Sequence, residues 1–175
     1  MASEAKPHSF IEGSSNGRTL GFDPNYLGSN PSPSAISSEN NNMLECLILG
    51  DSIAVGIQQQ RPECKSYAQV GINSRAYNKK FNTRKLDADT VVISLGSNDY
   101  DGINTVEELT KLRKKIKAKK VFWILPANNL QMAEHVETVG YIHGDILIRI
   151  PYLSKDGVHP SGAGYDRIAE LTKYY

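Results

Sequence analysis

A serine stands at a point in the chain where a nucleophile could act. Residues 44–49, Leu-Glu-Cys-Leu-Ile-Leu, form a short apolar run that ends at Gly50, and Asp51 and Ser52 follow directly. The run has the length of a buried strand, and residues 53–60 favour a short helix. Ser52 would then lie at the carboxyl edge of a sheet and the amino end of a helix, where backbone N–H groups attract an anion. This suits a catalytic serine, although an ordinary strand-to-helix connection has the same features.

Strand and helix patterns alternate along the chain from Met43. Residues 90–95, Thr-Val-Val-Ile-Ser-Leu, are β-branched and apolar, which is typical of a buried strand. The alternation predicts an α/β fold, a three-layer α/β/α sandwich with a five-stranded parallel sheet whose functional edge lies at the carboxyl ends of the strands. The expected strands are 44–49, 65–70, 90–95, 121–125 and 145–150, and the expected helices are 53–60, 74–81, 105–118, 129–139 and 162–173.

Four short motifs fall at those strand ends or in the last loop. They are Gly50-Asp51-Ser52, Gly71, Gly96-Ser97-Asn98-Asp99 and Asp156-Gly157-Val158-His159-Pro160. In this order and at these elements, the set resembles the SGNH hydrolases, also called the GDSL-like esterases, over residues 43–175. The resemblance implies a flavodoxin-like SGNH fold and a serine esterase that works through an acyl-enzyme. It also implies that Ser52, Asp156 and His159 are catalytic and that Ser52, Gly71 and Asn98 form the oxyanion hole.

The chemistry of these residue types agrees with those roles. A serine hydroxyl needs a base to take its proton, and His159 is the only histidine in a matching loop. Asp156 can accept a hydrogen bond from the other ring nitrogen, which selects the tautomer and stabilises the imidazolium. The N–H groups of Ser52 and Gly71 and the side-chain amide of Asn98 can donate to a tetrahedral oxyanion. Loss of one such donor typically costs about 3–4 kcal/mol of transition-state stabilisation.

Two further carboxylates adjoin the motifs. Asp51 and Asp99 are expected to accept hydrogen bonds from loop N–H groups and hold the turns, in preference to acting in catalysis. No third ligand accompanies Asp156 and His159 at metal-ligand spacing, so no metal and no other cofactor is expected.

Polar residues follow three of the expected strands and are predicted to form a substrate rim. They are Asn73, Arg75, Tyr100 and Asn128. Loops of a few residues and the lack of a lid-sized insertion predict an open, shallow site, which favours a small acyl group such as acetate on a polar carrier such as a glycan. A lysophospholipase or thioesterase of the same family is the alternative among enzymes. A catalytically silent glycan-binding domain is the alternative from another class.

Composition limits the other function classes. The chain has 175 residues, a formal charge of +1 and 39% hydrophobic residues, which fits one globular domain. Near-neutral charge argues against a nucleic-acid partner, and the basic run 111–120 has apolar residues at helical spacing, so it is interpreted as a solvated outer helix face. No apolar run suits a membrane span or a signal core, so a cytoplasmic location is expected by default. The oligomeric state and the source are left open.

The two cysteines are too few for a disulfide framework. Cys46 lies in the first expected strand and is predicted to be a buried, reduced side chain that packs as a small hydrophobic group.

Residues 1–42 differ from the rest of the chain. They are rich in Ser, Asn, Gly and Pro without an apolar period, which predicts a flexible leader before a compact domain, 43–175. Residues 28–31, Gly-Ser-Asn-Pro, can be back-translated into the T-arm of a transfer RNA gene, and residues 20–25 into a paired stem. The leader is therefore interpreted as an upstream extension of the reading frame that is not native, with Met43 as a candidate start. The coding DNA tests this hypothesis.

Overall fold

The computed structural model describes residues 10–11 and 43–175. The predicted leader therefore lies outside the described residues except for Phe10 and Ile11, and the back-translated residues 20–25 and 28–31 lie outside them entirely.

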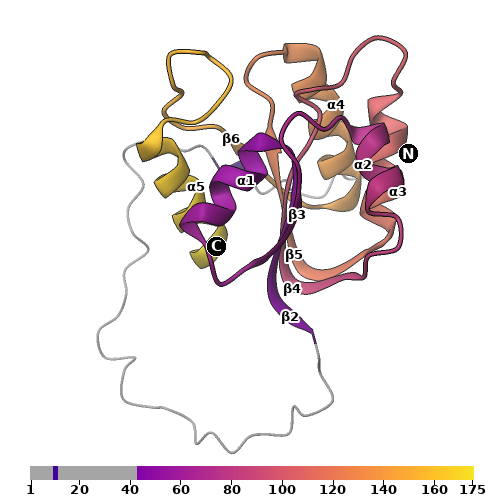
Figure 1. Ribbon diagram of the computed structural model, residues 1–175, viewed down its shortest axis with the longest axis horizontal. Helices are drawn as coiled ribbons and strands as arrows, with labels where there is room; N and C mark the ends of the chain where they lie inside the picture. The colour runs from indigo at the N-terminus through magenta and orange to yellow at the C-terminus, as the bar shows by residue number, and fades with distance from the viewer. Residues whose placement is uncertain (1–9, 12–42) are drawn as a thin grey trace, which may run out of the picture.

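All strands of the central sheet run parallel, in the order β1-β6-β5-β4-β2-β3, with their carboxyl ends at the top of Figure 1. The predicted α/β class and the five parallel strands are confirmed. The strands are β1 (Phe10–Ile11), β2 (Leu44–Gly50), β3 (Lys65–Ala68), β4 (Leu86–Ser94), β5 (Ile116–Leu125) and β6 (Ile146–Arg149). The helices are α1 (Ser52–Gln60), α2 (Ser74–Lys80), α3 (Thr105–Lys114), α4 (Leu130–His143) and α5 (Gly162–Tyr174).

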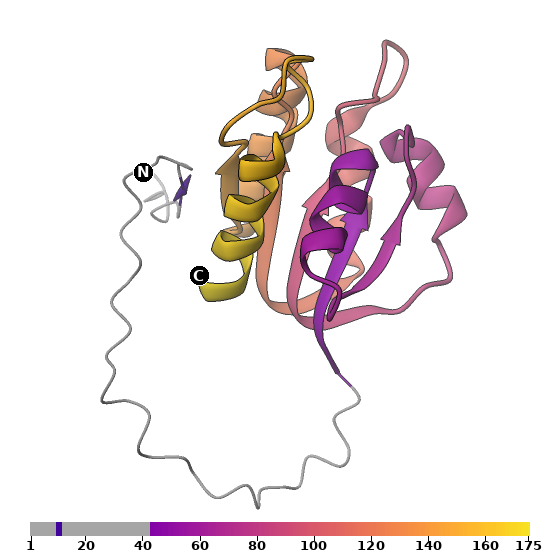
Figure 2. The ribbon, with the colours of Figure 1, turned by 60° about the vertical axis from the view of Figure 1, so that its left-hand side comes forward.

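Helices cover both faces of the sheet and close two apolar cores. Alternate residues of β2 point to opposite faces, so Leu47 and Leu49 enter one core and Cys46 and Ile48 enter the other. Helices α2, α3 and α4 pack on the first face, and α1 and α5 pack on the second (Figures 1 and 2). The predicted three-layer sandwich is confirmed.

The third helix is shorter than the sequence predicts. The expected helix spans 105–118, but α3 ends at Lys114 and β5 begins at Ile116. In β5, Ile116 and Ala118 pair with Leu86 and Ala88 of β4, which itself starts four residues before the expected strand 90–95. A buried neighbouring strand thus outweighs the helical spacing of the apolar residues. The basic run 111–120 is divided between α3 and β5 and does not lie on one helix, but its six lysines are exposed, as a solvated face requires.

The two cysteines form a disulfide, and the prediction of a reduced Cys46 is wrong. Cys46 and Cys64 are bonded at 2.02 Å, and both are buried. The physical reason is strand register, because Leu47 of β2 pairs with Lys65 of β3 and this pairing brings the two preceding residues side by side. The number of cysteines in the sequence gives no information about this strand register.

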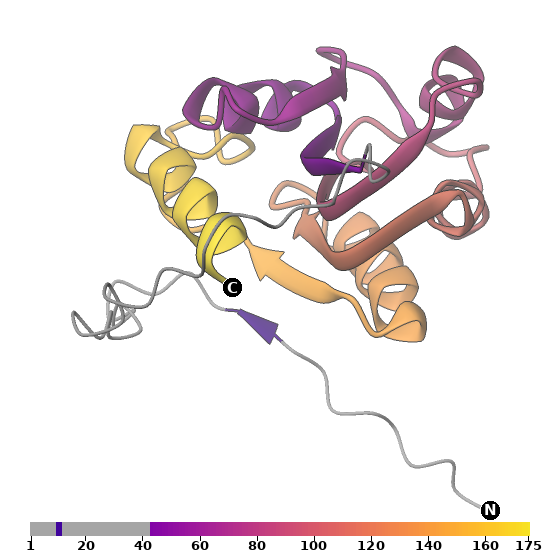
Figure 3. The same cartoon turned by 90° about the horizontal axis from the view of Figure 1, so that it is seen from below.

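A two-residue strand from the leader extends the sheet at one edge. Phe10 and Ile11 of β1 pair in parallel with Leu147 and Ile148 of β6 (Figure 3). The sheet therefore reaches beyond the predicted 43–175 domain by one short strand. In the part of the chain that the structure describes, no helix has both the length and the apolar character needed to cross a bilayer.

Candidate active site

The turn after β2 places Ser52 at the first residue of α1. Gly50 has a φ of +141°, and a Cβ there would lie 1.9 Å from the carbonyl oxygen of Ser94 in the adjacent strand β4. Only glycine fits this approach, in which the Asp51 N–H donates to the same oxygen at 3.0 Å. The N–H of Ser52 belongs to the first turn of α1, where backbone donors have no acceptor within the helix.

Asp51 caps α1 from a buried position. Its Oδ1 accepts hydrogen bonds from the Ile53 N–H at 3.0 Å and from the Ser94 hydroxyl at 3.1 Å. Its Oδ2 is buried without a partner among the described residues. Burial raises the pKa of Asp51 from 3.8 to about 6, against the opposing effect of these hydrogen bonds. The carboxylate thus holds the turn that carries Ser52, as the sequence predicts.

Ser52, His159 and Asp156 lie in one hydrogen-bonded chain, although Ser52 is 107 positions from His159 in sequence. The Ser52 hydroxyl oxygen is 2.8 Å from His159 Nε2, and His159 Nδ1 is 2.7 Å from Asp156 Oδ2. Such an arrangement can withdraw the serine proton and hold the positive charge that forms on the imidazole. The histidine and aspartate side chains are partly exposed, at 38% and 49% of their surfaces.

The loop after β6 fixes the orientation of Asp156. Its Oδ1 accepts from the Ser154 hydroxyl at 2.7 Å, the Val158 N–H at 2.8 Å and the His159 N–H at 2.9 Å. The Ser154 hydrogen bond and these backbone donors hold the pKa of Asp156 well below its usual range. Ser154 is a site residue that sequence analysis missed, and its place two residues before Asp156 was the available signal.

The three expected oxyanion donors come from neighbouring loops. Gly71 follows β3 in a turn closed by the Ile72 N–H and the Gln69 carbonyl at 3.3 Å. Gly71 has a φ of +77°, a backbone conformation that favours glycine, and a Cβ there would meet nothing within 4 Å. The Asn98 side-chain amide donates to the Ile72 carbonyl at 3.2 Å, which joins the β4 loop to the β3 turn. The second N–H of that amide is the one able to meet a substrate.

Asp99 has a structural position between two helices. Its carboxylate accepts from the Ser74 N–H at 2.8 Å, the Ser74 hydroxyl at 2.5 Å and the Thr105 hydroxyl at 2.8 Å. Ser74 and Thr105 begin α2 and α3. Asp99 therefore ties both helix starts to the loop that carries Asn98.

The predicted rim residues differ in their surroundings. Asn73 caps α2 by accepting from the Ala76 N–H at 2.8 Å, and Arg75 donates to the Gly102 carbonyl at 2.6 Å. Both side chains are thus engaged within the chain. Tyr100 and Asn128 are exposed, Tyr100 at 60%.

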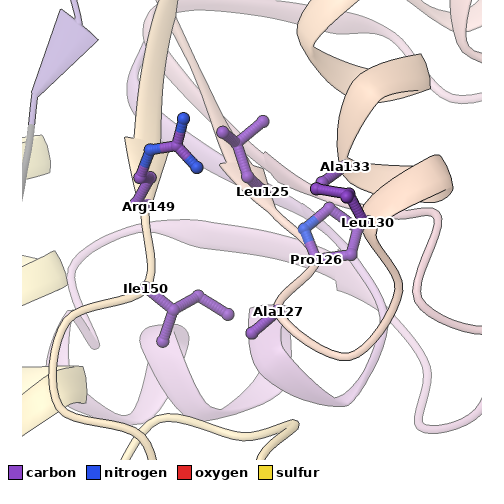
Figure 4. Close-up of a pocket in the computed structure, with 7 residues that line it drawn as sticks. All are labelled: Leu125, Pro126, Ala127, Leu130, Ala133, Arg149 and Ile150. Atoms are coloured by element: carbon purple, nitrogen blue, oxygen red, sulfur yellow. The ribbon is translucent and has the colours of Figure 1, made fainter.

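A pocket of about 250 Å³, lined by six apolar residues and Arg149, lies at the carboxyl ends of β5 and β6 (Figure 4). Its wall approaches the Asn98 loop, because Pro126 Cγ is 3.4 Å from the place of a Cβ on Gly96. Sequence analysis expected only polar residues around the site and missed this pocket. The lining residues are Leu125, Pro126, Ala127, Leu130, Ala133, Arg149 and Ile150.

One group of possible metal ligands lies elsewhere in the described residues. Cys46, Glu63 and Cys64 place ligand atoms within 4.8 Å of one another, but the disulfide engages both sulfurs.

Comparison with known proteins identifies the fold. No protein-family model matches the chain, and no curated protein sequence matches it. A proposed acylhydrolase from Bacteroides fragilis is 18% identical with a TM-score of 0.59, over 77% of this chain and 86% of that chain.

Two further solved structures are similar. The catalytic domain of peptidoglycan O-acetyltransferase A from Streptococcus pneumoniae, solved with a methylsulfonyl adduct, is 20% identical with a TM-score of 0.50, over 73% of this chain and 89% of that chain. A proposed GDSL-like lipase from Bacteroides uniformis is 13% identical with a TM-score of 0.53, over 72% of this chain and 92% of that chain. The chain therefore has the fold of the SGNH, or GDSL-like, hydrolases.

Proposed function

We propose that the protein is a serine esterase that transfers an acyl group through a covalent acyl-enzyme. The observation that carries the proposal is the hydrogen-bonded chain from the Ser52 hydroxyl through His159 to Asp156, with distances of 2.8 and 2.7 Å. In this assignment Ser52 is the nucleophile, His159 is the general base and acid, and Asp156 orients the imidazole.

The reaction follows from this geometry in two halves. Ser52 Oγ attacks the ester carbonyl carbon while His159 Nε2 takes its proton, and the carbonyl oxygen becomes an oxyanion. The tetrahedral intermediate collapses, and the alcohol leaves with the proton from His159. A water molecule then gives a proton to His159 and attacks the acyl-enzyme, which releases the carboxylic acid and restores Ser52.

The oxyanion is assigned to the N–H groups of Ser52 and Gly71 and the amide of Asn98. The link from Asn98 to the Ile72 carbonyl holds that side chain beside the Gly71 turn, so two of the donors are joined before substrate binds. Fixed donors of this kind stabilise the transition state without reorganisation.

The proposed substrate is a small acyl ester, such as an acetyl ester, on a carbohydrate. Partial exposure of His159 and Asp156 supports an open site that can admit a polar carrier. The similarity to the catalytic domain of a peptidoglycan O-acetyltransferase adds support, since that protein's name describes acetyl transfer to a glycan.

The apolar pocket favours a second candidate, a lysophospholipase or thioesterase that acts on a longer acyl chain. Six of its seven lining residues are apolar, and it lies beside the Asn98 loop. A chain that entered this pocket would gain about 0.8 kcal/mol for each buried CH₂ group.

A series of p-nitrophenyl esters from acetate to octanoate, assayed beside an acetylated oligosaccharide, tests the function and decides between these substrates. We expect kcat/KM to be flat or to fall with chain length, because an open polar site does not reward added methylenes. Values that rise to an optimum at octanoate would reject the deacetylase and support the second candidate.

Ser52→Ala should abolish hydrolysis of every ester, His159→Ala should be almost as severe, and Asp156→Ala should leave more activity. Retained hydrolysis in pure Ser52→Ala protein would reject the mechanism itself.

A further inference from the structure

Helices α1 and α5 meet at Gly56, where the Tyr165 ring occupies the space that a side chain would need. A Cβ on Gly56 of α1 would lie 2.4 Å from both Cε1 and Cζ of Tyr165 and 2.7 Å from its hydroxyl oxygen. Side-chain carbons do not approach ring atoms so closely, so any larger residue at position 56 must move Tyr165 or separate the helices. The two helices lie side by side on one face of the sheet (Figures 1 and 2).

This contact lies one turn from the nucleophile. Gly56 follows Ser52 by four residues in α1, and residues so spaced lie on the same helix face. The Tyr165 ring therefore lies against α1 one turn after Ser52. Burial raises the pKa of Tyr165, and the negative charges of Asp51 and Asp156 raise it further.

The start of α5 is in turn fixed to the loop that carries His159. A Cβ on Gly164 would lie 2.4 Å from the Pro151 carbonyl oxygen and 2.7 Å from that of Tyr152. The Ser161 N–H also donates to the Tyr152 carbonyl at 2.7 Å. Because the helix start and the loop are packed together, a displacement of α5 moves the loop and His159 with it.

We propose that the Gly56–Tyr165 contact is a spacer that sets the distance between Ser52 and His159. Gly56 and Tyr165 are thus positioning residues. The inference rests on the proposed esterase function. Ser52 belongs to α1 and His159 moves with α5, so the separation of these helices determines whether the 2.8 Å hydrogen bond can form. Hydrogen bonds weaken beyond about 3.2 Å, and a misplacement of about 1 Å can lower a rate about 100-fold.

The test substitutes Gly56→Ala and measures kcat and KM for p-nitrophenyl acetate, the rate of fluorophosphonate labelling, and Tm. We expect kcat and the labelling rate to fall at least about tenfold with KM nearly unchanged, because the nucleophile loses its base while the substrate contacts remain. Gly140→Ala is the matched control. A Cβ at Gly140 would lie 2.5 Å from Leu147 Cδ2, a similar overlap between α4 and the opposite face of the sheet. This control should lower Tm but retain the wild-type kcat.

A double variant separates spacing from general destabilisation. Tyr165→Ala removes the ring that a side chain at position 56 would strike. It should lower kcat in the wild-type background and raise kcat in the Gly56→Ala background, a reversal of sign that shows direct coupling. Wild-type kcat in folded Gly56→Ala, an equal loss of kcat in Gly140→Ala, or a double variant no more active than Gly56→Ala would overturn the proposal. A wild-type protein that neither hydrolyses esters nor labels would instead reject the esterase function on which the proposal depends.

Discussion

At the nucleophile turn, a buried carboxylate directly precedes the serine. Asp51 takes no part in the proposed reaction. It accepts hydrogen bonds from Ile53 and Ser94 and so joins α1 to β4 beside Ser52. The pKa of Asp51 is about 6 in the folded protein, whereas the ordinary pKa of an aspartate is 3.8. The turn is therefore held by a carboxyl group whose charged form is disfavoured by burial.

This difference predicts a pH dependence of stability. As the pH rises from 4 towards 6, the unfolded chain loses the Asp51 proton while the folded chain retains it, so the free energy of unfolding falls. The loss reaches about 3 kcal/mol above pH 6 and remains constant at higher pH. Asp51→Asn retains the acceptor for the Ile53 N–H and cannot titrate. The wild-type free energy of unfolding, relative to that of the variant, should therefore fall by most of that amount between pH 4 and 7.

Urea unfolding at several pH values measures this difference, with Asp101→Asn, at an exposed position outside the turn, as the control. A difference between wild type and Asp51→Asn that stays constant from pH 4 to 7 would contradict a raised pKa for Asp51.

Ser52, Asp156 and His159 could be proposed as catalytic from the sequence because residue types, motif order and the spacing within each motif are visible there. Sequence analysis could not identify Ser94 as the partner of Asp51, because that contact depends on the register that pairs Gly50 with Ser94 across β2 and β4. The apolar pocket was missed for a similar reason. Its lining residues come from β5, β6, α4 and their loops, which become neighbours only in the folded sheet.

At the scale of elements, pairing between strands decides whether a segment with an ambiguous local pattern forms a helix or a strand. Residues 116–118 fit either the end of α3 or the start of β5 by their spacing, and the buried partners Leu86 and Ala88 select the strand. The same parallel pairing brings Cys46 beside Cys64. Disulfides persist in oxidising compartments and are rare in the cytosol, so this bond favours an oxidising location over the cytoplasmic default.

The disulfide should contribute strongly to stability because it closes a loop between residues 18 positions apart. Reduction should lower the free energy of unfolding by about 3 kcal/mol, chiefly because the unfolded chain regains the entropy of an open loop. Urea unfolding with and without dithiothreitol measures this change, and the Cys46→Ala/Cys64→Ala variant should not respond to the reductant. Two titratable thiols in the native protein without reductant would show that the bond does not form.

At the scale of the whole molecule, the described residues of the two apolar cores and every proposed catalytic group lie within residues 43–175. The contribution of the described leader residues is β1, which pairs through two residues at the outer edge of the sheet. The five parallel strands and the two helical layers follow from patterns inside 43–175. The edge strand β1 could not be predicted from the sequence, because two residues are too few to show the alternation that marks a strand.

Removal of residues 1–42 should therefore leave a folded, active esterase. The truncated protein loses the β1–β6 pairing but keeps every core residue described within 43–175, so its kcat/KM should stay within about tenfold of the full chain, or about 1.4 kcal/mol in barrier terms. Ester hydrolysis and Tm of the two proteins measure this directly. An insoluble truncated protein, or a larger loss of turnover, would mean that the leader belongs to the domain.

The central claim is that His159 activates Ser52 as a nucleophile, and labelling with a fluorophosphonate probe followed by peptide mapping tests it most directly. Only an activated serine reacts readily with such a probe, so a glycan-binding domain without activity would not be labelled. We predict a single adduct on Ser52 in the wild-type protein, no adduct in Ser52→Ala, and a severe loss of labelling in folded His159→Ala. A wild-type protein that resists the probe, or an adduct on another residue, would contradict the account.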